Sequence, residues 1–493
     1  MMSKRILILL LLACGCMTSR PQTNGLRASV EVNEHPRTDS WRVTIKYSRP
    51  ADGLVFDVTR EPFRAAAWHI VKPANARWID IDHHDAISFA EPTDTVVLEF
   101  KSDLRPREKD YHVNVGFSDG SRLLYTGHLR SRPIFGIGTY DPRENVVHDW
   151  HFVTDTTRRI RLLDIAGTGL LRWPTPTAHW YGDTFVYFGP IRPMSTRNLQ
   201  LIADPALPPW LVPRLLDIAP RLFDDFARQT GTTLEFQPLA FVSWSGGNSP
   251  GFSFAGSTLT GVMQIAIAGS GWLQRTPESD AMWLRNTGHE IFHLWGGQVL
   301  TPADDAEWLS EASAEYFALV GLRDANVISE AMLHKAVVEA ANECIARIGD
   351  ASILQSGEEK KFRNFYTCGL VTQFLADRAI AGSSSHRRSI GTLYETMFDD
   401  VRTRTRRYST ADFENALGRL STDTEANREI AQLVEQGVAP APDAFFEAAL
   451  QRAGVEVSRV PLADATVNEA TLVFARASQD PALPMFLRLE SRQ

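Results

Sequence analysis

The HExxH pattern at residues 289–293 constrains this chain more than any other feature of its sequence. In a helix, residues four apart project from one face, so His289 and His293 can direct both imidazoles at the same metal ion. Glu290 then lies close enough to deprotonate a water that the metal activates. The pattern predicts a zinc-binding helix over about residues 278–295, ended by a pair of glycines.

Two histidines are too few for a protein zinc site, which needs a third ligand and an open position for water. Residues 307–317, EWLSEASAEYF, follow after a short connection and are expected to form a second helix. Its Glu311 can bring a carboxylate back to the metal. The sequence therefore predicts one Zn²⁺ per chain, held by His289, His293 and Glu311. Glu315, one turn further along, either orients one of the histidines or lies in solvent.

These two segments resemble the zinc-binding blocks of the gluzincin metallopeptidases, specifically the aminopeptidase N and glycyl aminopeptidase families. GHEIFHLWGG at 288–297 is similar to their zinc-helix block. WLSEASAEY at 308–316 is similar to their W-L-N-E-G-F-A-x-Y block, whose glutamate binds zinc. The resemblance covers about residues 198–453. It implies a zinc peptidase that hydrolyses peptide bonds, with Glu290 as the general base.

A third block, YTCG at 366–369, resembles the family's Y-x-K-G. The resemblance implies that the hydroxyl of Tyr366 donates a hydrogen bond to the developing oxyanion. A phenol suits this task because it is neutral at working pH and its hydrogen bond strengthens as charge builds on the substrate oxygen. The alternative is a core tyrosine that satisfies its hydroxyl elsewhere.

The family's G-x-M-E-N signature, which lies on an edge strand, is altered in this chain. At the matching spacing the chain reads GVMQI at 261–265, so the resemblance implies substrate contacts for Gly261, Met263 and Gln264. The family's glutamate pairs with the free α-ammonium of the substrate, whereas Gln264 carries no charge. The choice between aminopeptidase and endopeptidase therefore stays open. The backbone of this strand could still align an extended peptide by adding it to the sheet.

The chain, at 493 residues, is too long for one ordinary core, and we expect an α+β multidomain protein. Residues 26–197 carry short alternating runs between Gly, Pro and Asp turns, which predicts a β-rich N-terminal domain arranged as an antiparallel sandwich. The resemblance implies a thermolysin-like catalytic domain over 198–382, with a small mixed sheet and the zinc helices. Residues 383–493 read as a mainly helical region.

The N-terminus reads as a targeting segment. A basic pair precedes an apolar run at residues 6–13, which is too short to span a bilayer but suits a secretory signal. The run ends in LLACGC, which resembles a bacterial lipobox, so residues 1–16 are expected to direct lipidation of Cys14 or Cys16. The alternative is an ordinary cleaved signal. Either way we expect export, and the lipobox implies a lipid-anchored protein of the cell envelope, on its periplasmic or surface side.

The remaining features restrict partners and chemistry. A net charge of −8 without a basic stripe gives no support to nucleic-acid binding, and the expected partner is a peptide or protein substrate. Membrane contact is expected only through the lipid anchor, and the oligomeric state stays open. Cys344 and Cys368 could pair in an oxidising compartment or remain buried thiols. A non-catalytic peptide-binding lipoprotein on the same fold is the alternative function, although such a protein has no need for the base Glu290.

Overall fold

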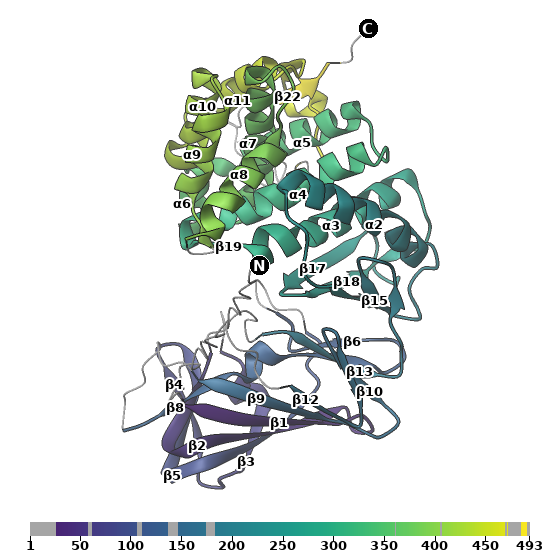
Figure 1. Ribbon diagram of the computed structural model, residues 1–493, viewed down its shortest axis with the longest axis vertical. Helices are drawn as coiled ribbons and strands as arrows, with labels where there is room; N and C mark the ends of the chain where they lie inside the picture. The colour runs from purple at the N-terminus through teal and green to yellow at the C-terminus, as the bar shows by residue number, and fades with distance from the viewer. Residues whose placement is uncertain are drawn as a thin grey trace, which may run out of the picture.

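The computed structural model describes residues 26–57, 62–105, 111–136, 146–173, 183–359, 361–404, 407–468, 471 and 485–490. The predicted signal segment, with Cys14 and Cys16, lies outside these residues. Figure 1 shows a β-rich N-terminal part, a smaller sheet next to it, and a large group of helices beyond that sheet. The protein is therefore a mixed α+β structure, as the sequence predicts.

Thirteen strands of the N-terminal part form one sheet, in the order β3-β5-β2-β1-β9-β12-β11-β10-β13-β7-β6, with β4 paired to β5 and β8 paired to β2. The strands and short helices of this part are β1 (Arg27–His35), β2 (Ser40–Phe56), α1 (Arg64–Ala67), β3 (Trp68–Lys72), β4 (Arg77–Ile81), β5 (His84–Lys101), β6 (Asn114–Gly116), β7 (Arg122–Tyr125), η1 (Thr126–Leu129), β8 (Ser131–Ile134), β9 (Val147–Val153), β10 (Arg159–Leu162), β11 (Ile165–Thr168), β12 (Leu170–Trp173) and β13 (Phe185–Gly189).

The prediction of an antiparallel sandwich in this part agrees with most of the strand pairs, and strands that are distant in the sheet order face each other, since the rings of Trp41 in β2 and Phe188 in β13 have centroids 5.0 Å apart. The pairs are antiparallel, except that β1 and β9 are parallel, but the ladders connect all these strands into a single sheet. The reason lies in β2 and β5, which are 17 and 18 residues long. Their pairing shifts register between Lys46 and Gly53, and a strand bent by such irregularities can bond to different neighbours along its length. Accordingly β2 pairs with β1, β5 and β8.

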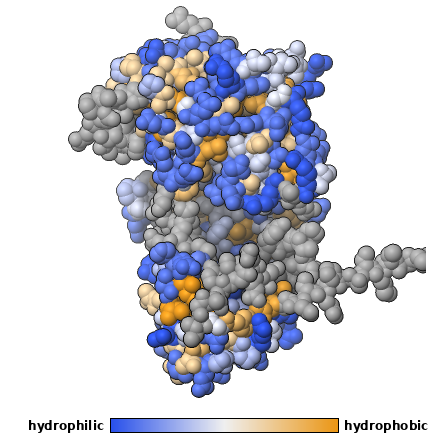
Figure 2. All heavy atoms as spheres, turned by 90° about the vertical axis from the view of Figure 1, so that its left-hand side faces the viewer, coloured by the Kyte–Doolittle hydropathy of each residue, from blue (hydrophilic) through white to orange (hydrophobic). Residues whose placement is uncertain are grey.

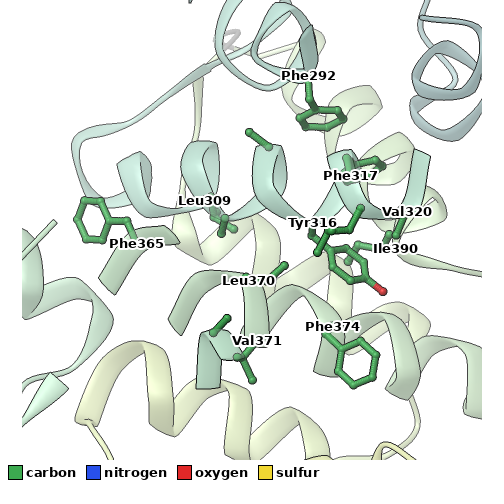
Figure 3. Close-up of a cluster of buried hydrophobic side chains, with 14 of the residues drawn as sticks. Phe292, Leu309, Tyr316, Phe317, Val320, Phe365, Leu370, Val371, Phe374 and Ile390 are labelled. Carbon is green, nitrogen blue, oxygen red and sulfur yellow. The ribbon is translucent and has the colours of Figure 1, made fainter. Parts of the chain in front are cut away.

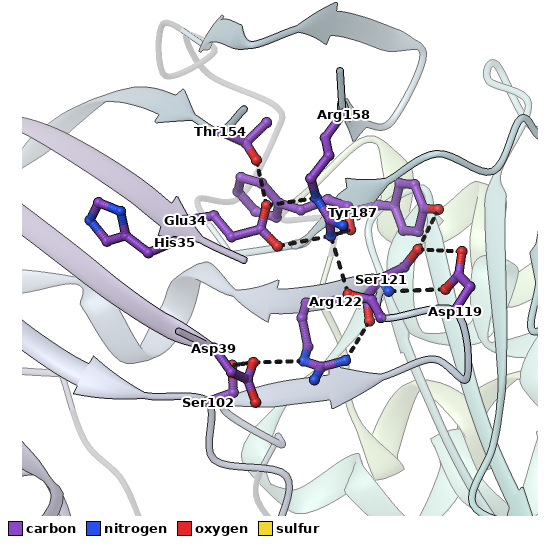
Figure 4. A network of polar contacts seen from close by, with 12 residues as sticks. Glu34, His35, Asp39, Ser102, Asp119, Ser121, Arg122, Thr154, Arg158 and Tyr187 are labelled. Atoms are coloured by element: carbon purple, nitrogen blue, oxygen red, sulfur yellow. Dashed lines mark hydrogen bonds and ion pairs between the residues drawn. The ribbon is translucent and has the colours of Figure 1, made fainter. Parts of the chain in front are cut away.

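A buried polar network fastens one end of this sheet (Figure 4). Glu34, the penultimate residue of β1, accepts hydrogen bonds from Thr154 and from Arg158, whose Nη2 lies 2.9 Å from Glu34 Oε1. The same guanidinium donates to the carbonyl oxygen of Phe188 in β13 at 2.8 Å. Burial raises the pKa of Glu34, against the opposing effect of Thr154 and Arg158. The network thus links β1 to β13 across the sheet.

A second, five-stranded sheet lies beside the first, in the order β14-β15-β16-β18-β17. Strands β15, β16 and β18 are parallel, whereas β14 and β17 pair antiparallel at the two edges. Its strands are β14 (Met194–Ser195), β15 (Gln200–Ala203), β16 (Leu239–Trp244), β17 (Ser253–Leu259) and β18 (Val262–Ala268).

The expectation that residues 261–265 lie on an edge strand, which the resemblance implies, is wrong. Residues 262–265 lie in β18, which pairs with β16 on one side and with β17 on the other. Gly261, with φ +73°, makes the turn that folds β17 back against β18. The edge strand is therefore β17, which precedes the turn, and β18 has no free edge for a peptide to join.

Helices cover the five-stranded sheet and make up most of the remaining chain. Figure 3 shows Phe292 of α3, Phe317 of α4 and Phe374 of α7 in one buried cluster, so α4 packs between α3 and α7. The helices are α2 (Leu211–Thr230), η2 (Ser270–Trp272), α3 (Pro277–His293), η3 (Leu294–Val299), η4 (Asp304–Ala306), α4 (Glu307–Asp324), α5 (Glu330–Ile348), α6 (Ile353–Glu358), α7 (Arg363–Ser383), α8 (Ile390–Arg402), α9 (Thr410–Leu420), α10 (Thr424–Ala431), η5 (Gln432–Gln436), α11 (Pro442–Arg452) and η6 (Leu462–Asp464). The short strands β19 (Thr301–Pro302) and β20 (Arg407–Tyr408) pair with each other, as do β21 (Val457–Val460) and β22 (Phe486–Leu489).

The two sheets pack together through a shared apolar cluster. It contains side chains of both sheets, and the rings of Tyr187 in β13 and Phe241 in β16 stack with centroids 6.0 Å apart. The N-terminal part is therefore held against the sheet that carries the edge strand β17, which brings residues of both parts to one cavity.

On the face that Figure 2 shows, mainly hydrophilic residues lie over the helical part, with smaller hydrophobic groups between them. The large apolar side chains that are exposed, such as Leu104, Leu170, Leu273 and Met332, belong to separate segments, which is normal for a folded protein surface. Within the described ranges, no helix combines the length and apolar character that crossing a bilayer requires.

Candidate active site

The HExxH residues lie where predicted, at the C-terminal end of α3. A capping box between Thr276 and Ser279 starts this helix, with Pro277 as its first residue. Small residues then let the neighbouring helices approach closely. A Cβ added to Gly288 of α3 would lie 3.2 Å from the Cβ of Ala318 in α4. Such close packing brings the polar side chains of the two helices together.

The side chains of His289, His293 and Glu311 converge on one point. The two Nε2 atoms are 3.0 Å apart, and Glu311 Oε2 lies 3.3 Å from each of them. Ligand atoms at the corners of a tetrahedron around zinc, with bonds of about 2.0–2.1 Å, are separated by about 3.3–3.4 Å. Although buried, Glu311 Oε2 makes no hydrogen bond. The donor set and its spacing therefore fit a zinc ion with one further coordination position.

Each imidazole has a different neighbour behind it. His289 Nδ1 lies 3.4 Å from Glu315 Oε1, and Glu315 Oε2 accepts two hydrogen bonds from Arg285 at 3.0 and 2.7 Å. His293 Nδ1 lies 3.3 Å from the hydroxyl of Ser310. Glu315 is thus next to His289 and not in solvent. Such partners fix the ring orientation of metal-binding histidines.

The carboxylates dominate the electrostatics around the histidines. Burial disfavours a charged imidazole, but Glu311 and Glu315 outweigh it and raise the pKa of His289 to about 10. Burial likewise opposes ionisation of Glu311, yet the two histidines bring its pKa below the usual range. The pocket therefore favours positive charge at His289. A metal dication can supply that charge in place of a proton, because zinc binds the deprotonated forms of its ligands.

Glu290 is buried beside this cluster. Burial raises the pKa of its carboxyl group, and Glu311 adds to the rise, while the two histidines oppose it. The hydroxyl of Thr258, on the edge strand β17, lies 3.0 Å from Glu290 Oε2. A carboxylate with a raised pKa is suited to accept a proton and later return it.

Tyr366 faces the same cluster from α7. Its ring stacks against His289 with centroids 5.7 Å apart. Burial, together with Glu311 and Glu290, raises the pKa of its hydroxyl far above the ordinary value, so the phenol stays protonated and can donate. Its placement follows from another close approach, since a Cβ added to Gly369 would stand 2.6 Å from the Cβ of Ala312 in α4.

One cavity of about 610 Å³ is lined by the three converging side chains and by the two residues beside them, namely His289, His293, Glu311, Glu290 and Tyr366. Strand β17, η3, the start of α4, α7 and the N-terminal part all contribute to its wall. The lining residues are Tyr111, His112, Ala255, Gly256, Ser257, Thr258, Gln264, His289, Glu290, His293, Gly297, Gln298, Pro302, Glu307, Ser310, Glu311, Phe362, Phe365 and Tyr366. A cavity of this size accommodates several residues of an extended peptide.

The three residues predicted to contact the substrate lie in different places relative to the cavity. Gln264 lines the cavity, where its Oε1 accepts a hydrogen bond from Ser257 and its buried Nε2 makes none. Gly261 lies in the turn between β17 and β18 and is not in the cavity wall. Met263 is fully buried among apolar side chains. Successive residues of a strand face opposite sides, so Met263 and Gln264 cannot both face the cavity.

Cys344 and Cys368 form a disulfide that joins α5 to α7. The two cysteines are 24 residues apart in sequence, and in the loop-entropy account a cross-link of that span stabilises a fold by about 3 kcal/mol. Cys368 lies two residues after Tyr366, so the disulfide also anchors the helix that carries the phenol.

We expect the double variant Cys344→Ser/Cys368→Ser to unfold at a lower urea concentration, with a free energy of unfolding about 3 kcal/mol smaller. Urea titrations of both proteins under oxidising conditions measure the difference. A titration of the wild type with reductant should reproduce it, and equal midpoints in all three would contradict a stabilising disulfide.

Several residues of the site were missed by sequence reasoning. Arg285 lies four residues before His289, a spacing that places it on the same helical face, but this signal is weak alone. Ser310 precedes the proposed ligand directly. Thr258 lies on an edge strand and Gln298 in η3, and nothing in their local sequence marks them. They come together only because β17 folds back against α3.

Comparisons with known proteins bear on the fold. No family model matches the sequence, and no curated protein matches it. The structure is similar to the crystal structure of an aminopeptidase N family protein from Idiomarina loihiensis, with a TM-score of 0.65 and 12% sequence identity. The similarity covers 88% of this chain and 80% of that chain. The two proteins thus share an overall fold.

Proposed function

We propose that this protein is a zinc-dependent peptidase. The observation that carries the proposal is the convergence of His289, His293 and Glu311 in a cavity that Glu290 and Tyr366 also line. A metal-binding site alone needs neither a buried carboxylate of raised pKa nor a protonated phenol beside it. The overall fold, shared with an aminopeptidase N family protein, supports the same conclusion.

In this proposal, His289, His293 and Glu311 would hold the zinc ion, which when bound would supply Lewis-acid chemistry to the site. Glu290 accepts a proton from the attacking water and delivers it to the nitrogen of the leaving amine. Tyr366 donates its hydroxyl hydrogen to the carbonyl oxygen as negative charge develops there. Glu315 and Ser310 hold the two imidazoles in orientation from behind.

The edge strand β17 offers a place for the substrate main chain. Its outer edge pairs with no other strand in the described part of the chain, and four successive residues, 255–258, line the cavity. An extended peptide can hydrogen-bond to such an edge. We propose a peptide or protein substrate on these grounds. The proposed catalytic region is 198–382, between the β-rich region 26–197 and the mainly helical region 383–493.

We further propose that the protein acts in the bacterial cell envelope. The proposal rests on the lipobox-like sequence with Cys14 and Cys16. The disulfide between Cys344 and Cys368 is in keeping with an oxidising compartment.

The test of the proposed function is metal content measured together with peptide cleavage. We expect wild-type protein to contain one zinc per chain and to cleave peptides in a broad library. Glu311→Ala removes one of three protein ligands, so its zinc affinity should fall at least about a hundredfold and its activity should fall with it. Mass spectrometry of the metal and of the peptide products gives both readouts.

A matched control is Glu307→Ala, one turn earlier on the same helix and exposed at the cavity. It should keep its zinc. Stoichiometric zinc in Glu311→Ala would contradict the ligand assignment. Wild-type protein that binds zinc but cleaves no peptide would favour a peptide-binding role instead.

The residues that line the cavity also predict that the protein hydrolyses peptides whose amino terminus is blocked. Among the described residues that line it, the carboxylates are Glu290, Glu311 and the exposed Glu307. Gln264 offers a neutral amide, and a buried ammonium without a counter-charge is costly. We therefore expect N-acetylated and free peptides of one sequence to be hydrolysed at rates within about threefold of each other. Loss of cleavage on acetylation would show that the free amine is required.

A further inference from the structure

The edge strand β17 runs directly beside the catalytic glutamate. A Cβ added to Gly256 would stand 2.1 Å from Glu290 Oε1 and 2.3 Å from its Cδ. At these distances a side chain at Gly256 would displace the Glu290 carboxylate. Its backbone does not require glycine, because its φ is outside the left-handed region. The absence of a side chain at Gly256 therefore leaves space for the Glu290 carboxylate.

A second contact from the same strand holds the other carboxylate oxygen. The Thr258 hydroxyl lies 3.0 Å from Glu290 Oε2 and 3.0 Å from the Glu290 carbonyl oxygen, and it can donate to either. Gly256 and Thr258 are two residues apart on a strand, so they face the same side. One oxygen of Glu290 therefore lies over the glycine while the other meets the hydroxyl.

The strand is itself fastened to the chain that follows α3. Gln298 of η3 donates to the carbonyl oxygen of Thr258 at 3.2 Å, and its Oε1 accepts from the Thr260 hydroxyl at 2.7 Å. On its other side β17 pairs with β18 along its whole length. The strand is thus fixed relative to Glu290 from both sides.

We propose that Gly256 and Thr258 are positioning residues that set the place of Glu290 for proton transfer. The inference rests on the proposed function, because it gives Glu290 the role of the base. A general base must lie within hydrogen-bond reach of the proton it takes, and a displacement of about 1 Å can cost about a hundredfold in rate. Neither residue needs to touch the substrate or the metal to have this effect.

The test uses two substitutions with matched controls in the full-length, zinc-loaded protein. Gly256→Ala fills the space beneath Oε1, and we expect kcat to fall about a hundredfold with little change in KM. Thr258→Val keeps the shape of the side chain but removes the hydroxyl, and kcat should fall about tenfold. Thr258→Ser restores the donor and should recover most of the rate. Gly382→Ala, where an added Cβ meets nothing within 4 Å, should behave as wild type.

Crystal structures and zinc contents of these variants provide readouts independent of turnover. We expect full zinc occupancy, with the Glu290 carboxylate moved away from β17 in Gly256→Ala. Since Gly256→Ala could fail to fold, the Val and Ser pair at Thr258 decides the question alone. Wild-type rates in Thr258→Val, or no rescue by Thr258→Ser, would overturn the inference while leaving the peptidase assignment intact. A wild type that cleaves no peptide defeats the proposed function, whereas the crystal structures still report whether β17 places Glu290.

Discussion

Replacing Glu290 with glutamine should reduce kcat about a thousandfold or more while the protein keeps its zinc. Glutamine has almost the same shape, so the packing against Gly256 and the hydrogen bond from Thr258 can persist. It cannot accept a proton from water, however, and general acid–base catalysis contributes roughly a hundredfold to ten-thousandfold. The effect should appear in kcat, because Glu290 is not among the three converging metal ligands.

The control is Glu278→Gln, an identical change on the exposed first turn of the same helix. It should match the wild type in kcat, KM and zinc content. Steady-state hydrolysis of a fluorogenic peptide, with metal analysis of the same samples, measures all three. If zinc-loaded Glu290→Gln turned over within about tenfold of wild type, another group would have to act as the base.

The local part of the site could be predicted from sequence because it depends on helical spacing. His289 and His293 share a face of α3. Glu311 lies on the next helix after a short connection, and its carboxylate contacts both histidines. The same periodicity puts Glu315 on the face of Glu311, but it left open whether Glu315 contacts a histidine or lies in solvent. These relations need the helix repeat, a short connection and the close packing of α3 against α4.

The edge strand could not be predicted in this way. Spacing placed the substrate-aligning strand at Gly261 to Gln264, but the turn at Gly261 reverses the chain and leaves β17 outermost. Which of two adjacent strands is outermost depends on pairing with β16, a contact between distant parts of the sequence. The role of Thr258 depends on that pairing as well.

In the N-terminal region, too, the pairing of distant strands could not be predicted from the sequence. Alternating burial in β1 and β2 follows from their sequences. Nothing local indicates that Gly53 in β2 pairs with Ser88 of β5 and also with Ile134 of β8. The strands were therefore predictable, whereas their union into one sheet was not.

Tyr366→Phe tests the second catalytic group, and we expect kcat to fall about a hundredfold to a thousandfold with KM nearly unchanged. Phenylalanine keeps the ring that stacks on His289, so the metal ligands should stay in place. The variant removes only the hydroxyl, whose hydrogen bond gains strength as charge develops on the carbonyl oxygen. Loss of one such donor typically costs that much in rate.

A specific result separates this role from simple packing. Tyr187→Phe, which removes a buried hydroxyl bonded to Ser121 in the N-terminal sheet, should leave kcat unchanged. If Tyr366 served only to fill space, Tyr366→Phe would match that control, since the ring remains. A rise in KM at constant kcat would instead mean that the hydroxyl binds the ground state of the substrate. A fall confined to kcat identifies a donor whose contact with the substrate matters most in the transition state, because binding that is equal in both states leaves kcat untouched.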